Sequence, residues 1–206
     1  MKTILGKKLG MSQMFDPDSG TMTPVTVIEA GPCPVVQVKS AGTDGYDAVQ
    51  LAFGEVEERK LSKPEVGHLK KAGVAPHRHL VEFRGQSELT VGETVTVEAF
   101  EPGDAIKVSG ITVGKGYQGT IKRHNFSRGP VTHGSHNVRK PGSIGASATP
   151  SRVFKGPKMA GQMGAKTVTQ VGLTVVDRDV EQNLLLVKGA VPGHKNGYVV
   201  VREDSR

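Results

Sequence analysis

Short runs of Val, Ile and Thr recur along the chain, and several of them alternate apolar with polar residues. Thr94–Glu98 and Lys107–Ser109 alternate strictly, which is the period of a strand with one buried face. Turn-forming residues separate the runs, as at 192–197. Many short strands with frequent turns predict a mainly β fold, either a barrel or a sandwich. The predicted strands are Val25–Ile28, Val35–Lys39, Ala48–Phe53, Thr90–Ala99, Ile106–Val113, Thr167–Val176, Leu184–Ala190 and Tyr198–Arg202.

One segment has the pattern of a helix. Ser62 and Glu65 have the spacing of a capping box, and Pro64 falls early in the first turn. Gly73 is suited to end the helix. These signals predict a small α-containing insertion at 55–88, between two sets of strands.

The stretch 105–176 differs from the rest of the chain in charge. The 206 residues carry 27 Lys and Arg and 20 Asp and Glu, a net charge of +7. This stretch of 72 residues holds eleven of the basic residues and none of the acidic ones, which leaves 16 basic and 20 acidic residues elsewhere. Such a segregated charge predicts a polyanionic partner.

The middle of this stretch, 123–164, is rich in Gly, Pro, Ser, His and Asn and has little periodicity. Loops longer than ~15 residues are uncommon in compact domains and are usually functional or disordered. Ordering each residue costs ~1–2 kcal/mol of backbone entropy, and few large apolar side chains are present to offset it. We therefore expect 123–164 to be an extended loop that a partner orders.

The residue types in this loop favour nucleic acid, and folded RNA in particular. Aromatic residues make up only 4% of the chain, so base stacking is a minor contribution. Phosphates, 2′-hydroxyls and RNA shape are then the main features recognised. The side chains predicted to contact RNA are Lys7, Lys8, Lys115, Lys122, Arg123, Arg128, His133, His136, Arg139, Lys140, Arg152, Lys155 and Lys158.

Catalytic interpretations find little support in the sequence. Gly114–Gly119 matches G-x-G-x-x-G, but Thr120–His124 is expected to lead into a loop, and no acidic residue follows before Asp177. A dinucleotide site needs a helix and an acidic residue there. No Gly-x-Ser-x-Gly nucleophile motif is present. We predict no enzyme, no catalytic residue, no cofactor and no small-molecule substrate.

Three alternatives remain open at this point. His124, His133 and His136 could bind zinc in a metal hydrolase, although their spacing matches no known ligand pattern and we predict no metal site. A DNA-architectural protein would use the same basic residues and bind duplex DNA equally well. A regulatory binding module is a third possibility. Outside the loop, His77–His79 is expected to form a solvated turn.

Cellular context follows from what the chain lacks. Cys33 is the single cysteine, which excludes a disulfide framework, and we expect it to be a small buried side chain. The amino-terminal segment turns basic before any apolar stretch develops, unlike a signal peptide. No apolar run approaches the ~20 residues of a membrane helix. The sequence predicts a cytoplasmic protein without membrane contact.

Several longer motifs resemble bacterial members of the universal large-subunit ribosomal protein three family, and together they cover nearly the whole chain. They include the core signature Gly110, Gly114-Lys115-Gly116, Gly119 and Arg123. The other matching segments are Gly6–Met11, His133–Gly145, Val153–Gly164 and Asn183–Gly193.

The resemblance implies a translation-protein-type β-barrel formed by 1–54 and 89–206, with a small α/β insertion at 55–88 and the loop 123–164. It also implies a protein that binds 23S ribosomal RNA near its 3′ end, nucleates large-subunit assembly and touches neighbouring ribosomal proteins. Ala146 replaces a glutamine that some members methylate, so we predict no such modification. The loop tip would approach the peptidyl-transferase centre with Gly142, Ser143, Ile144, Gly145, Ala146, Ser147 and Ala148.

Overall fold

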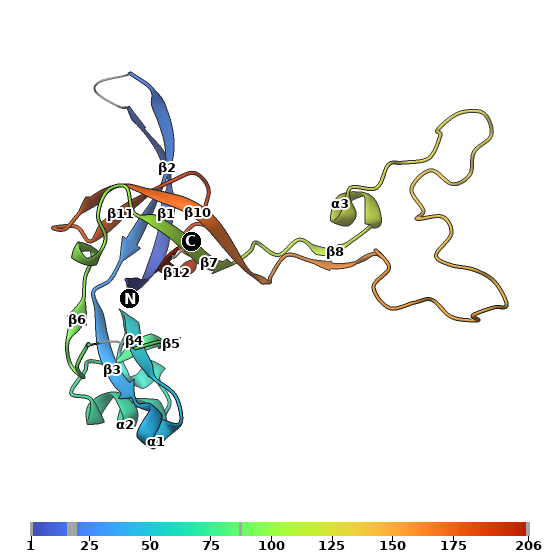
Figure 1. The fold of residues 1–206 in the computed structure, drawn as a ribbon. Coiled ribbons are helices and arrows are strands. Elements are labelled where there is room, and N and C mark those ends of the chain that lie inside the picture. Colours follow the sequence, from blue (N-terminus) through green and yellow to red (C-terminus); the bar gives the residue numbers. More distant parts are fainter. Residues whose placement is uncertain (1, 16–19, 87, 205–206) are drawn as a thin grey trace. The chain divides into compact units, whose positions relative to one another are not determined.

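The computed structural model describes residues 2–15, 20–86 and 88–204. The chain forms two compact units (Figure 1). The barrel unit comprises residues 1–112 and 167–206, and the basic unit comprises residues 113–166. The basic unit is therefore an insertion between two strands of the barrel unit.

Six antiparallel strands close into a barrel in the order β1-β12-β7-β10-β11-β2, and this confirms the predicted mainly β barrel fold. Buried positions alternate along the strands as the sequence pattern required. Val201 of one strand is paired with Val108 of its neighbour, and both side chains are fully buried. The strands are β1 (Thr3–Phe15), β2 (Met22–Ala30), β7 (Ala105–Ile111), β10 (Thr167–Asp179), β11 (Leu184–Lys188) and β12 (Tyr198–Glu203).

The first strand, β1, was not among the predicted strands because glycines and paired lysines interrupt its apolar pattern. The structure explains one of these interruptions. A Cβ atom on Gly6 would lie 2.7 Å from the Glu29 carbonyl oxygen and 2.8 Å from Ile28 Cγ2. The close approach of β1 and β2 therefore requires glycine at this position.

A second sheet, in the order β5-β4-β3-β6, packs beside the barrel within the same unit. The predicted insertion spans 55–88, whereas this sheet also takes the strands that begin at residues 33 and 48. Its strands are β3 (Cys33–Lys39), β4 (Ala48–Glu55), β5 (His77–Arg84) and β6 (Thr94–Val95). The helical elements around it are α1 (Ala41–Asp44), η1 (Glu58–Lys60), α2 (Lys63–Lys71) and η2 (Val97–Ala99).

The predicted helix is present as α2, and its capping box forms. The Glu65 carboxylate accepts hydrogen bonds from the Ser62 backbone N–H at 2.9 Å and from the Ser62 hydroxyl at 2.8 Å. These bonds, the backbone one first, hold the pKa of Glu65 below its ordinary value. Leu69 anchors the helix because its side chain is buried against the second sheet.

Two local predictions were wrong in this unit. His77–His79 is not a solvated turn but the start of β5, where pairing with β4 satisfies its backbone. The alternating run Thr90–Ala99 yields only the two-residue strand β6, followed by η2. Val97 and Phe100 are both fully buried, and the short 3-10 helix η2 brings both side chains into the core.

Cys33 is a free, fully buried thiol, as predicted. Its Sγ lies 3.5 Å from the Leu5 carbonyl oxygen. Burial raises the pKa of this thiol to about 12, so it stays protonated and unreactive at neutral pH.

The basic unit contains three short elements: β8 (Gly116–Gln118), α3 (Thr120–His124) and β9 (Gly161–Met163). The five residues of α3 were expected to lead into a loop, and this expectation was wrong. Asn125 ends the helix in the left-handed conformation, with φ of 59°. All residues of 113–166 are described, and Thr120 is the only buried one.

Candidate nucleic-acid interface

The basic unit concentrates positive charge without any compensating carboxylate. Ten of the 27 Lys and Arg and none of the 20 Asp and Glu lie within 113–166, which leaves 17 basic and 20 acidic residues in the rest of the chain. No ion pair can form inside the unit, so its cations raise the local potential together. The exposed ones are Lys115, Lys122, Arg128, Arg139, Lys140, Arg152, Lys155, Lys158 and Lys166.

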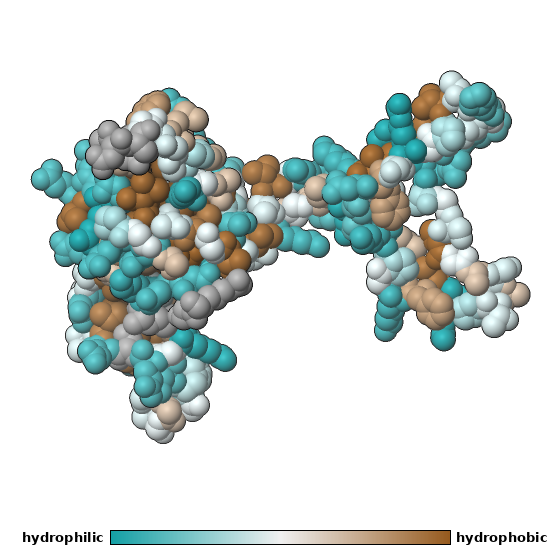
Figure 2. All heavy atoms as spheres, turned by 45° about the horizontal axis from the view of Figure 1, so that its top comes forward, coloured by the Kyte–Doolittle hydropathy of each residue, from teal (hydrophilic) through white to brown (hydrophobic). Residues whose placement is uncertain are grey.

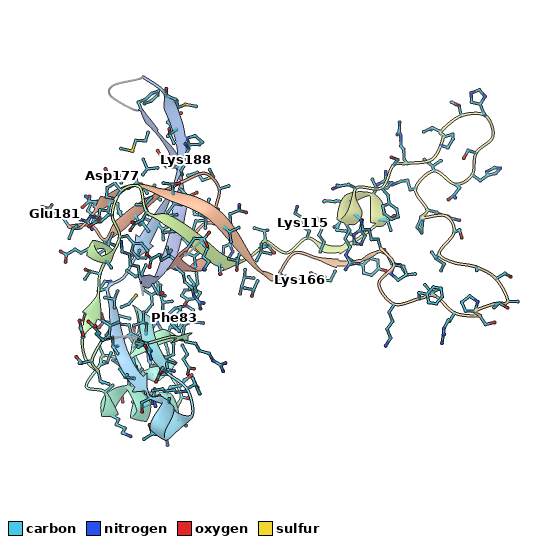
Figure 3. All side chains as sticks on the ribbon, viewed as in Figure 1. Phe83, Lys115, Lys166, Asp177, Glu181 and Lys188 are labelled. Atoms are coloured by element: carbon cyan, nitrogen blue, oxygen red, sulfur yellow. The ribbon has the colours of Figure 1, made fainter. Side chains whose placement is uncertain are left out.

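Two paired strands form the neck of this unit. β8 and β9 are antiparallel, with Tyr117 opposite Gln162, and the Lys115 N–H donates to the Met163 carbonyl at 2.9 Å. Figure 3 labels Lys115 and Lys166 on the outgoing and returning segments. A Cβ atom on Gly164, where φ is +72°, would overlap the Val113 carbonyl oxygen. The neck therefore depends on glycine at this position.

A clasp at α3 holds the base of the loop 125–160 together. Arg123 Nη1 donates to the Met159 carbonyl at 2.6 Å, and His124 Nε2 donates to the same oxygen at 3.0 Å. A Cβ atom on Gly161 would lie 2.7 Å from Arg123 Nη1, so the guanidinium lies directly against this glycine. Arg123, predicted to contact a phosphate, thus also has an internal structural role.

A further closure lies inside the loop. The Gly129 N–H donates to the Val138 carbonyl at 2.8 Å and draws the segment 129–138 into a ring. A Cβ atom on Gly129 would overlap the Asn137 carbonyl oxygen, so only glycine fits. His133 and His136, both predicted RNA contacts, are exposed on this ring.

The predicted tip residues, 142–148, are all exposed. Among these described tip residues, one side-chain hydrogen bond forms within the tip: the Ser143 hydroxyl donates to the Gly145 carbonyl at 3.1 Å. Small residues without internal packing let a backbone approach another surface closely. Figure 2 shows hydrophilic residues and residues of intermediate hydropathy over most of the visible surface of the basic unit, with a few hydrophobic residues among them.

Exposed aromatic rings accompany the cations. Tyr117 is 77% exposed and Phe154 is 64% exposed, although both carry large apolar surfaces. Rings in such positions can stack on unpaired bases, while phosphates neutralise the cations around them. Backbone hydrogen bonds and glycine contacts, rather than an apolar core, define the shape of this interface.

Lys7 and Lys8, also predicted to contact RNA, lie outside the basic unit on β1. Both are half-buried. The Lys8 ammonium donates to the carbonyls of Val191 at 2.8 Å and Gly193 at 3.2 Å, so it stabilises the turn before β12. The sequence pattern did not reveal this internal role, because the contact joins residues more than 180 positions apart.

The structure gives no geometric support to the metal-hydrolase alternative. Among the described residues, no three or more His, Cys, Asp or Glu side chains gather as a metal site. His124 is engaged in the α3 clasp, 6.2 Å from the ring of Phe126. In the described part of the chain, no helix is long and apolar enough to span a membrane.

Comparison with known proteins identifies the relatives of this chain. The family model for Ribosomal protein L3 matches residues 81–179. The chain is 54% identical over 192 residues to the large ribosomal subunit protein uL3 of Gloeothece citriformis, which covers 92% of this chain and 91% of that protein. It is also 54% identical over 205 residues to uL3 of Trichlorobacter lovleyi, covering 98% and 97%. The chain is also 54% identical over 205 residues to uL3 of Corynebacterium jeikeium, and the match covers 98% of this chain and 94% of that protein.

Together with these relatives, the β-barrel and its acid-free basic unit define the class of this protein. It is a structural, non-enzymatic protein of the ribosome. The chain belongs to the uL3 family of the large ribosomal subunit. The resemblance drawn from the sequence motifs is thereby confirmed.

Proposed function

We propose that this chain is a primary RNA-binding protein that attaches to 23S ribosomal RNA near its 3′ end and nucleates assembly of the large subunit. In this proposal the loop 123–164 enters the folded RNA, and its tip at 142–148 extends toward the peptidyl-transferase centre. The observation that carries the proposal is the basic unit itself, with ten cations, no carboxylate and a single buried residue.

The mechanism is electrostatic and geometric. Cations on the loop contact phosphates and release the counterions condensed on the RNA, so that binding weakens as salt rises. The neutralised RNA helices can then approach one another, and this promotes assembly without any side-chain chemistry. The assigned phosphate contacts are Lys122, Arg123, Arg128, Arg139, Lys140, Arg152, Lys155 and Lys158.

The remaining parts of the chain take supporting roles in this proposal. The barrel part of the domain 1–54 and 89–206 docks on the RNA surface with Lys7 and Lys8 of β1, and Lys115 contacts RNA from the neck of the basic unit. Neighbouring ribosomal proteins touch other parts of the globular surface. The surplus of carboxylates outside the basic unit supports this division, because they repel phosphates and suit protein contacts.

A salt titration with a deletion variant tests the proposal. The full chain and a version lacking 125–160 are titrated with 23S rRNA fragments, tRNA and duplex DNA. The deletion is feasible because its flanks already touch, with Arg123 against Gly161. It removes six cations, so the slope of log K against log salt should fall by up to about four to five, at ~0.7–0.9 per phosphate contact.

The expected result is that one 3′-proximal rRNA fragment binds more tightly than the other nucleic acids, and that the deletion lowers its salt slope. Equal affinity for all polyanions, with no effect of the deletion, would contradict the proposal. Equal affinity for duplex DNA and structured RNA, with a strong deletion effect, would favour the DNA-architectural alternative instead.

A further inference from the structure

A pocket of about 240 Å³ lies on the barrel unit, where the barrel meets the second sheet. Lys7 of β1 and Tyr198 of β12 line it from the barrel, and Phe53 of β4 and His79 of β5 line it from the sheet. Pockets that enclose drug-sized ligands measure roughly 300–1,000 Å³. This smaller pocket suits a single small planar group.

Strand pairing places the lining side chains in the pocket. Lys7 is opposite Tyr198 in the barrel, and Phe53 is opposite His79 in the second sheet. The His79 and Tyr198 rings are stacked, with centroids 4.5 Å apart and planes inclined by 18°. The ring centroids of Phe53 and Tyr198 are 6.3 Å apart. The two sheets thus jointly build an aromatic cluster in which His79 and Tyr198 are partly exposed and Phe53 is buried.

Glycine keeps this aromatic cluster open. Gly54 has φ of +75°, and a Cβ atom there would lie 3.7 Å from His79 Cδ2. A side chain at position 54 would cover the imidazole edge and fill part of the pocket. The left-handed conformation also disfavours any other residue at this position.

Polar and charged groups surround the aromatic pair. Lys7 and Arg78 supply positive charge, and Arg78 is exposed. Glu55 and Asn196, both exposed, can exchange hydrogen bonds with the edge of a bound ring. Burial, and secondly the charge of Arg78, lower the pKa of His79, so its ring is neutral at neutral pH and stacks without added charge.

We propose that this pocket binds one nucleotide extruded from folded ribosomal RNA. The base stacks on the His79–Tyr198 surface, and its phosphate lies toward Lys7 and Arg78. RNA-binding proteins commonly read bulged nucleotides in this way, with aromatic or histidine rings against the base and cations against the backbone. The inference rests on the proposed RNA-binding function and adds a second, base-reading contact far from the loop in sequence.

The test separates stacking from charge by measuring affinity for a 3′-proximal 23S rRNA fragment over a range of salt. His79→Ala should weaken binding about fivefold or more, the lower end of the loss of one stacked base, without changing the salt slope. Arg78→Gln should weaken binding and lower the slope by ~0.7–0.9, the value of one phosphate contact. Amide spectra establish that each variant is folded.

The matched control is Arg59→Gln, which removes the same charge from a side chain that is 79% exposed and lies outside the pocket. It should leave affinity and slope unchanged. If His79→Ala unfolds the barrel unit, His79→Leu takes its place, because leucine keeps an apolar side chain of similar volume but has no ring to stack on a base.

Wild-type affinity in the folded pocket variants would overturn the inference. An effect of Arg78→Gln alone, with a folded His79→Ala variant at wild-type affinity, would also overturn it, because only a surface charge would remain. The proposed function still holds after either result if the 125–160 deletion lowers the slope of log K against log salt as expected. Failure of that deletion as well would contradict the proposed function itself.

Discussion

The barrel unit and the basic unit of this chain differ in what holds their side chains in place. Every apolar side chain that is buried in the described residues belongs to the barrel unit, where two sheets share a main core and α2 covers a second, smaller one. In the basic unit only Thr120 is buried, and glycine contacts and carbonyl hydrogen bonds define the backbone. The charges differ too, with all the carboxylates of the chain outside the basic unit.

This contrast shows how a small protein can combine stability with a surface that suits RNA. Burial of apolar area stabilises the barrel unit independently of any partner. The basic unit lacks this stabilisation by buried apolar area. Its like charges also repel one another until phosphates neutralise them. Substitutions of buried residues in the barrel unit should therefore affect folding, whereas substitutions of exposed cations in the basic unit should affect binding.

The largest expected effect is on the core of the barrel unit. Phe100 is fully buried, and Phe100→Ala should lower the free energy of unfolding by about 3–5 kcal/mol, because it leaves a cavity. Urea denaturation followed by circular dichroism measures this change. The matched substitution Phe154→Ala, in the basic unit, should change stability by less than ~0.5 kcal/mol because the ring is 64% exposed. Similar losses in the two variants would contradict the division into a packed unit and an unpacked one.

A second prediction concerns the glycine at the neck of the basic unit. Gly164→Ala places a Cβ atom against the Val113 carbonyl oxygen and should break the β8–β9 pairing locally. Strain of ~1–3 kcal/mol should speed exchange of the Lys115 amide hydrogen roughly fivefold or more.

Gly116→Ala is the control for this substitution. Gly116 also has positive φ, at +66°, but a Cβ atom there would meet nothing within 4 Å. This variant should therefore perturb exchange less than Gly164→Ala. The unfolding midpoint of the barrel unit should be unchanged in either variant, and a shifted midpoint would show that the neck and the core are coupled.

A third prediction tests two of the loop cations together. Lys155→Ala with Lys158→Ala should weaken binding to the rRNA fragment and lower the salt slope by ~1.4–1.8, as expected for two lost phosphate contacts. Lys63→Ala with Lys71→Ala removes the same charge from exposed positions of α2 in the barrel unit and should leave the slope unchanged. An unaltered slope in the loop variant would exclude these two lysines as phosphate contacts.

The smallest expected effect is a pH dependence confined to the barrel unit. The Lys39 ammonium, with the Tyr46 hydroxyl second, holds the pKa of Glu82 below its ordinary value of 4.5. The Glu101 backbone N–H, with the Lys2 ammonium second, holds the pKa of Asp104 below its ordinary value of 3.8. The folded-state pKa values are depressed, so this stabilisation is complete above the ordinary values and is lost as pH falls through the depressed ones.

Chemical denaturation between pH 6 and pH 3 measures this dependence. Glu82→Gln should flatten part of it, because the substituted side chain does not titrate. Amide signals of β8 and β9 should show no carboxylate titration in the same range, since the basic unit contains no Asp or Glu. An equal pH dependence in the Glu82→Gln variant would exclude the Lys39–Glu82 pair as its source.

Much of the fold could be predicted from local pattern. The alternation at 106–111 and 198–202 became strands of the barrel, and the spacing of Ser62 and Glu65 became a true capping box. Local patterns failed where tertiary contacts dominate. His79 belongs to a strand because β4 pairs with it, and Thr90–Ala99 is mostly coiled because Val97 and Phe100 both reach the core.

The candidate interface divides in the same way. Charge segregation is a property of composition, so the acid-free stretch and its cations could be recognised from residue types alone. The roles of Arg123 and Lys8 could not, because each binds carbonyl groups far away in sequence. The same reason hid the His79–Tyr198 surface, whose two rings come from different sheets.

Residue types and short spacings were enough to establish three properties of this chain. It is mainly β, one segment carries much of its positive charge and lacks carboxylates, and its motifs are those of uL3. The folded arrangement was needed to show which cations are engaged internally, which glycines are sterically required and where two sheets form a pocket. Those features depend on distances between residues that are remote in sequence, and only the folding of the whole chain sets such distances.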